Sequence, residues 1–168
     1  GDIMVHDTQV YGAYNTQTGE YDFSAFFKET APYFKEADLS VANLEVTFGG
    51  TESGKYSGYP AFNTPDSLAD TIKNSGMNFL ITANNHSYDT GLFGLKRTAQ
   101  ILKQKGIDFI GTRETTKDRT YAVKVINGIK IGTVINQKLD TQDYTAKVDM
   151  SIASNIKLPV DSVASIVS

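Results

Sequence analysis

The strongest constraint on the fold is a nearly continuous apolar run at residues 77–83 (Met-Asn-Phe-Leu-Ile-Thr-Ala), which leads directly into a polar stretch at 84–89. A short run of this kind is typical of a parallel strand that is covered on both faces. One helix is predicted before it, from Thr64-Pro65 to Gly76, and another after it, over 91–105. This order of helix, strand and helix predicts a layered α/β domain.

Further elements follow from the spacing of apolar and turn-forming residues. Phenylalanines at helical spacing predict a helix over 23–36 with a buried aromatic face, and Pro32 is expected to kink or shorten it. Short buried strands are predicted at 38–42 and 107–110, and loops at 11–21 and 47–61. Two alternating segments, 121–126 and 129–135, flank an Asn-Gly pair, which favours a hairpin with a type I′ turn. Residues 136–168 show only weak periodicity and receive no assignment.

The composition excludes several classes of protein. The 168 residues suit one domain over 1–168, with 40% hydrophobic and 21% charged residues. Lysine and arginine number 16 against 19 acidic residues, a net charge of −3, so we expect no basic surface for nucleic acid. The chain has no cysteine, which excludes thiolate metal sites, disulfides and a cysteine nucleophile. No apolar run is long enough to span a membrane.

Polar side chains gather where three predicted strands end. Asp2 lies in a short N-terminal stub, Asn43 and Glu45 follow the strand at 38–42, and Asn85 and His86 follow the apolar run. Because ligands bind beyond the carboxyl ends of parallel strands, we expect these side chains to lie on one rim of the sheet. Oxygen and nitrogen donors without sulfur suit Mn, Fe, Zn or Mg. Such an ion could polarise a phosphoryl oxygen and lower the pKa of a bound water.

The same residues also have a purely structural interpretation. Asparagine and aspartate are common in the turns that follow strands, and Asp89 or Thr90 could simply cap the helix at 91–105. His6 could be a surface histidine, and Tyr59 could pin the 47–61 loop to the core instead of contacting a substrate. Spacing alone leaves both interpretations open.

Several motifs, taken in order, resemble those of the CapA family of bacterial capsule-biosynthesis proteins, which act in poly-γ-glutamate synthesis. The resemblance covers about residues 1–135, and the stretch from Asn84 to Gly91 is its most specific part. The motifs are Gly1-Asp2-Ile3-Met4-Val5-His6, Ala42-Asn43-Leu44-Glu45, Phe62-Asn63-Thr64-Pro65, Ala83-Asn84-Asn85-His86-Ser87-Tyr88-Asp89-Thr90-Gly91, Gly94-Leu95 and Gly106-Ile107 to Gly111-Thr112.

That family is similar to the calcineurin-like metallophosphoesterases, which hold two metal ions at the rim of a β-sandwich flanked by helices. The resemblance therefore implies this fold and one or two divalent ions. Matched by motif, Asp2 and Asn85 are implied metal ligands, and Asn43 or Glu45 would occupy the position of the second acidic ligand. Asn85 and His86 are the implied catalytic pair, with His86 near the substrate phosphate, and the candidates for substrate contact are His6, Asn84 and Tyr59.

The chain departs from the phosphoesterase pattern in its later part. Histidine motifs expected further along are absent, since His6 and His86 are the only histidines. We therefore expect the CapA-like domain to be an incomplete copy, and the start at Gly1 without a methionine suggests an upstream segment. Two alternatives stay open: a non-catalytic scaffold or polymer-binding protein on the same fold, and a phosphodiesterase unrelated to capsules.

The resemblance also implies a setting for the protein. Relatives usually carry an N-terminal anchor or signal, so the expected location is the extracellular face of the cell membrane or the cell surface. The expected partners are the capsule polymer or its precursors and membrane-bound synthase subunits, with no nucleic acid.

Overall fold

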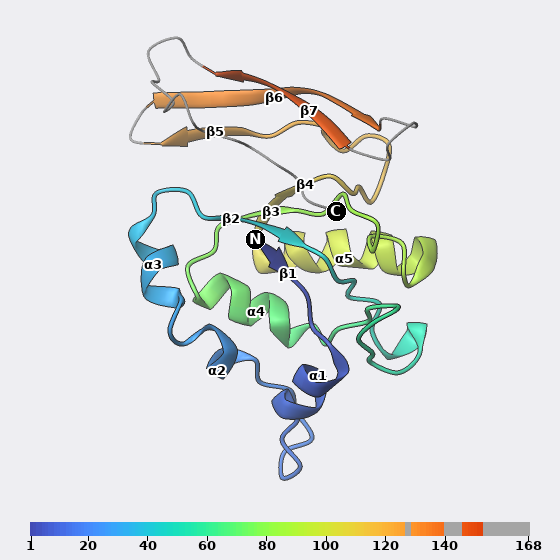
Figure 1. Cartoon of the computed structure of the whole chain (residues 1–168). Helices are drawn as coiled ribbons and strands as arrows, with labels where there is room; N and C mark the ends of the chain where they lie inside the picture. The colour runs from blue at the N-terminus through green and yellow to red at the C-terminus, as the bar shows by residue number, and fades with distance from the viewer. Residues whose placement is uncertain (127–128, 140–145, 153–168) are drawn as a thin grey trace. The chain divides into compact units, whose positions relative to one another are not determined.

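The computed structural model describes residues 1–126, 129–139 and 146–152, and the chain divides into two compact units, 1–118 and 119–168. The first unit contains a four-stranded sheet in the order β1-β2-β3-β4, and every neighbouring pair is parallel (Figure 1). The strands are β1 (Asp2–Ile3), β2 (Val41–Leu44), β3 (Phe79–Ile81) and β4 (Asp108–Ile110). This confirms the predicted α/β class, while a single domain over 1–168 stays a prediction.

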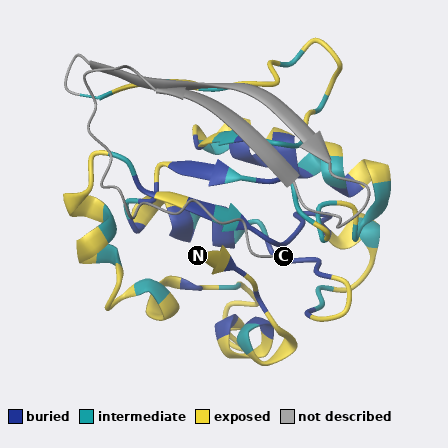
Figure 2. Ribbon diagram, turned by 45° about the horizontal axis from the view of Figure 1, so that its top comes forward, coloured by how far each residue is buried: buried dark blue, intermediate teal, exposed yellow. Residues whose placement is uncertain are grey.

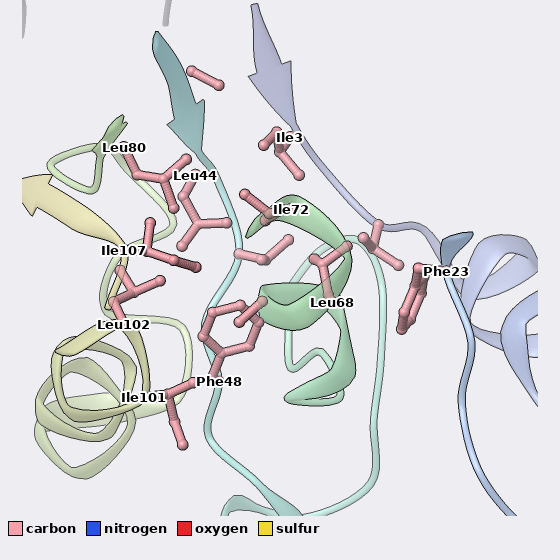
Figure 3. Packing of buried hydrophobic residues seen from close by; sticks show 14 of the residues in the cluster. Ile3, Phe23, Leu44, Phe48, Leu68, Ile72, Leu80, Ile101, Leu102 and Ile107 are labelled. Carbon is pink, nitrogen blue, oxygen red and sulfur yellow. The ribbon is translucent and has the colours of Figure 1, made fainter. Parts of the chain in front are cut away.

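Two helices, α4 (Ser67–Asn74) and α5 (Gly91–Lys105), cover one face of this sheet (Figures 1 and 3). Side chains alternate along a strand, so Leu44 and Leu80 point into the core while their neighbours point away from it. Leu44 and Leu80 pack with Ile72 of α4 and Leu102 of α5 in one buried cluster. Figure 2 shows that the buried residues of this unit gather on the strands and on the helix faces turned toward them. This packing fixes the strand ends on which the candidate site is built.

The predicted helix over 23–36 is wrong as a single element. The structure has two short helices, α2 (Ser24–Phe27) and α3 (Ala31–Glu36), separated at 28–30. Pro32 lies in the first turn of α3, where its missing N–H costs nothing, so it begins a second helix instead of kinking one. The aromatic face is also only partly buried, because Phe23 lies in the core whereas Phe26 is exposed.

Three boundaries differ from those expected. A helix that was not predicted, α1 (Asp7–Ala13), occupies the first part of the expected 11–21 loop. The strand expected at 38–42 lies at 41–44, so Asn43 belongs to the strand and does not follow it. Helix α4 is preceded by Asp66 and not by Thr64, whereas α5 spans 91–105 as predicted. The 47–61 segment is a loop, as expected, with one short 3₁₀ turn at Thr51–Ser53.

The second unit contains a three-stranded antiparallel sheet. Its strands are β5 (Val123–Ile126), β6 (Ile129–Leu139) and β7 (Ala146–Ile152). The predicted pairing of the two strands around Asn127-Gly128 is confirmed, and the predicted turn itself lies outside the described residues. Strand β7 falls in the tail that received no assignment. Within the described part of the chain, no helix has the length and apolar character that crossing a membrane requires.

Candidate functional site

The centre of the candidate site is an asparagine that links two carboxylates. Asp2 and Asn43 are register partners on β1 and β2, and Glu45 lies two residues beyond Asn43, so all three side chains share one side of the sheet. The Asn43 Nδ2 group donates to Asp2 Oδ1 at 3.0 Å and to Glu45 Oε2 at 2.8 Å. Asp2, which lies 41 positions before Asn43 in the sequence, therefore forms one polar row with Asn43 and Glu45, as the sequence predicted.

Asn84 extends this row from the loop that follows β3. Its Nδ2 group donates to Asn43 Oδ1 and to the Leu44 carbonyl oxygen, both at 2.9 Å. Its Oδ1 accepts the backbone N–H of His86 at 3.0 Å, which shapes the turn that carries the histidine. Asn85 is exposed, and its side chain makes no hydrogen bond with the described residues. The amide that joins the polar row is thus Asn84, which the resemblance had placed at the substrate.

The electrostatics of the row are unfavourable for Glu45. Glu45 is buried, and burial is the main reason that its pKa is raised above the ordinary value of 4.5. The negative charge of Asp2 raises this pKa further, and His86 opposes the shift. Two carboxylates that share one amide donor therefore leave an excess of negative charge, which a cation would relieve.

His86 is held by a carboxylate on its own loop. Its Nδ1 lies 2.8 Å from Asp89 Oδ2, and both side chains are largely buried. An ionised carboxylate can only accept, so this contact places the imidazole proton on Nδ1, and Nε2 makes no hydrogen bond with the residues that the structure describes. Asp89 Oδ2 also accepts the backbone N–H of Phe62 at 2.7 Å, which ties the loop to the segment after 47–61. Asp89 therefore orients the histidine, although the sequence had suggested only a helix cap for it.

Phe62 brings the two histidines of the chain to one place. Its ring meets His86 at 4.7 Å between centroids and His6 at 5.5 Å, in both cases nearly perpendicular. His6 precedes α1 and is exposed, while Phe62 is fully buried. Tyr59 lies in the same loop with 68% of its surface exposed, so it does not pin the loop to the core. The contacts of Phe62 and Asp89 have no local signal in the sequence, because each depends on how two loops pack.

The donor set fits a divalent cation in its chemistry. Asp2 and Glu45 each supply a hard carboxylate oxygen that contacts the Asn43 Nδ2 group, and together they carry the excess of negative charge. Among the residues that the structure describes, no three histidine, cysteine or acidic side chains converge closely enough to form a complete metal cage. Asp2 and Glu45 are therefore the side chains that would hold an ion, with amide or water oxygens completing its coordination.

Comparison with known proteins identifies the family. The chain matches the family described as bacterial capsule synthesis protein PGA_cap over residues 1–159. It therefore belongs to this family of capsule synthesis proteins, which confirms the resemblance noted from the motifs.

Individual relatives are longer than this chain. The capsule biosynthesis protein CapA of Bacillus anthracis is 26% identical over 140 residues, which are 80% of this chain and 32% of CapA. The uncharacterized proteins y4sH and y4uA of Sinorhizobium fredii (strain NBRC 101917 / NGR234) are each 32% identical over 102 residues, 57% of this chain and 22% of theirs. The matched region thus spans between about a fifth and a third of these curated relatives.

Proposed function

We propose that this chain is part of a protein that acts in the synthesis or export of poly-γ-glutamate or a related capsule polymer, through a metal-dependent phosphoesterase site on its parallel sheet. Membership of the capsule synthesis family supports the biological role. One observation carries the chemical part of the proposal: two carboxylates converge on Asn43 at the edge where His86 is also held. The expected location stays the extracellular face of the membrane, with capsule polymer and synthase subunits as partners.

Each residue of the proposed site would have a role that follows from its position. Asp2 and Glu45 would hold one or two divalent ions, such as Mn, Fe, Zn or Mg, which supply Lewis acidity toward a phosphoryl oxygen when bound. Asn84 fixes the distance between the polar row and the histidine loop through its three hydrogen bonds. His86 presents Nε2 as the atom that can accept or donate a proton, because Asp89 occupies Nδ1.

Hydrolysis of a simple phosphodiester tests this chemistry. We expect bis(p-nitrophenyl) phosphate to be cleaved in the presence of Mn²⁺, and we expect EDTA to abolish the cleavage. His86→Ala should lower kcat by about 10²- to 10⁴-fold, the usual range for loss of a general acid or base. An exposed aspartate outside the polar row provides the matched control, and Asp22→Ala should leave the rate unchanged. Turnover that survives both EDTA and His86→Ala would refute the assignment.

A second function is favoured by the hydrogen bonds that the side chains of the polar row make with one another. The Asn43 amide already donates to both carboxylates, and its oxygen already accepts from Asn84, so the hydrogen-bonding groups of this amide are satisfied within the row itself. A scaffold or polymer-binding protein needs no more than this. In a strain that lacks the corresponding full-length gene, a scaffold would restore capsule polymer equally well with Asp2→Ala or His86→Ala. The phosphoesterase proposal predicts that both variants lose the polymer.

A further inference from the structure

A crevice lies between α4 and the segment that leads into and through α2, and we call it the α2–α4 crevice. The two helices lie against each other (Figure 1), and the crevice between them has a volume of about 300 Å³. Pockets that bind small molecules begin at about this volume. The side chains of the polar row and both histidines lie outside its lining, so the crevice is separate from the candidate metal site.

The wall that α4 contributes is polar, although it faces another helix. Four of its uncharged polar side chains line the crevice at helical spacing: Ser67, Thr71, Asn74 and Ser75. The apolar residues Leu68 and Ile72 turn instead toward the core, as an amphipathic helix requires. Buried hydroxyl groups nearly always have a hydrogen-bond partner. The buried Ser67 Oγ nevertheless has none among the residues that the structure describes.

The opposite wall supplies aromatic surface. Tyr21 and Phe27 both line the crevice and are partly buried. The Tyr21 ring contacts two other tyrosine rings, Tyr14 at 5.0 Å and Tyr56 at 5.3 Å between centroids. These contacts hold the Tyr21 ring in place, so the crevice has a fixed aromatic surface on one side and polar side chains on the other.

The charges around the crevice balance at neutral pH. Asp22, Asp70 and Lys28 are the charged residues that line it, and Asp70 pairs with Lys105 at 2.7 Å. Asp22 is also engaged, because its Oδ1 accepts the backbone N–H of Ser24 at 2.8 Å. Two negative charges therefore face two positive charges. A ligand with a net charge gains little from such an arrangement, which favours a neutral ligand.

We propose that the α2–α4 crevice binds one unit of a neutral sugar, either free or as part of a chain. The Lys28 ammonium, the Asn74 amide and the Tyr21 hydroxyl make no hydrogen bond with the described residues. Sugar hydroxyls both donate and accept, so they match this mixture of donors and acceptors. The C–H groups of a sugar ring can pack on the aromatic surface of Tyr21 and Phe27. The volume suits one sugar unit rather than several.

Saturation-transfer NMR on the intact protein tests this proposal, with EDTA present so that the result does not depend on a bound metal. The probes are the methyl glycosides of glucose, galactose, mannose and N-acetylglucosamine, and we expect at least one to bind in the millimolar range. Lys28→Ala and Asn74→Ala should each raise the binding midpoint about fivefold, which corresponds to about 1 kcal/mol for one lost hydrogen bond. Both side chains are exposed, so circular dichroism should show an unchanged fold.

The matched controls are Lys96→Ala and Gln104→Ala, which remove exposed side chains of similar kinds from α5 and should leave the midpoint unchanged. A disaccharide of the bound sugar should bind no more tightly than its methyl glycoside. The proposal is overturned if no glycoside binds, if Lys28→Ala and Asn74→Ala bind as well as the wild type, or if the zwitterion glycine binds more tightly than every sugar. Sugar binding without phosphodiester cleavage would count against the proposed enzyme alone.

Discussion

Asn63 is the residue whose replacement should most clearly expose how the loop beside the site is held. It is 2% exposed, and its side chain makes three hydrogen bonds to the backbone of the 47–61 loop. Oδ1 accepts from the Gly49 N–H at 3.0 Å, and Nδ2 donates to the carbonyl oxygens of Gly50 at 2.9 Å and Lys55 at 3.3 Å. Asn63→Asp keeps the shape and the accepting oxygen but turns the donor into a second acceptor.

The expected loss of stability follows from these contacts. At neutral pH the variant buries a carboxylate whose second oxygen faces two carbonyl oxygens, and an uncompensated buried charge of this kind costs about 3–5 kcal/mol. The introduced carboxyl should therefore have a higher pKa in the folded chain than in the unfolded chain. Its protonated form regains one donor, so the penalty is smallest below the unfolded pKa and grows as pH rises through the folded one.

Urea unfolding at several pH values checks this prediction. The chain has nine tyrosines and no tryptophan, so tyrosine fluorescence and circular dichroism are the suitable probes. Asn74→Asp is the control, because Asn74 is exposed at the end of α4, and it should cost about 0.5 kcal/mol or less. An Asn63→Asp chain as stable as this control, or a penalty that does not shrink in acid, would refute the reasoning.

Three further substitutions test other parts of the structure. Glu45→Gln should raise the free energy of unfolding at neutral pH. The pKa of Glu45 is raised in the folded chain, so ionisation of this carboxyl removes stability as pH rises above about 4.5 through the folded-state pKa. Denaturation midpoints at acidic and neutral pH check this prediction. Arg97→Lys should cost about 1–3 kcal/mol in urea unfolding, because lysine cannot form the two-pronged contact with Asp66 at 2.6 and 2.8 Å. Gly111→Ala should lower Tm and cost about 2 kcal/mol or more, because φ is +123° and the new Cβ would lie 2.4 Å from the backbone nitrogen of Ala83. An unchanged midpoint in any of the three would contradict its argument.

The parallel sheet and the polar row could be predicted because each depends on local patterns. The apolar run before Asn84 indicates a covered strand, and the carboxyl ends of parallel strands meet at one edge. The spacing of Asn43 and Glu45 by two residues then places both side chains on one side, and the structure shows that arrangement. The sequence motifs placed Asn85 with these side chains, whereas the structure joins Asn84 to them, because adjacent loop residues point in different directions according to the turn.

Other features depend on packing between distant segments and left no local signal. Arg97 looks like a solvated charge on a helix, yet it is only 20% exposed and pairs with Asp66 at the start of α4. The spacing of Leu92, Leu95, Ala99 and Leu102 predicts one apolar face on the helix at 91–105, yet Leu92 is 54% exposed, whereas Ala99 and Leu102 are buried. The contacts of Phe62 with both histidines arise only when two loops and the N-terminal turn come together.

Metal content after loading with Mn²⁺ tests the central claim most directly. On the intact protein, elemental analysis should find about one to two ions per chain in the wild type and in Asp22→Ala. Asp2→Ala and Glu45→Ala should lose the bound metal, and Asn85→Ala tests whether that exposed amide is a ligand. The account predicts stoichiometric metal that depends on the two carboxylates of the polar row. Wild-type protein without stoichiometric metal would contradict the metal-dependent site and favour the scaffold.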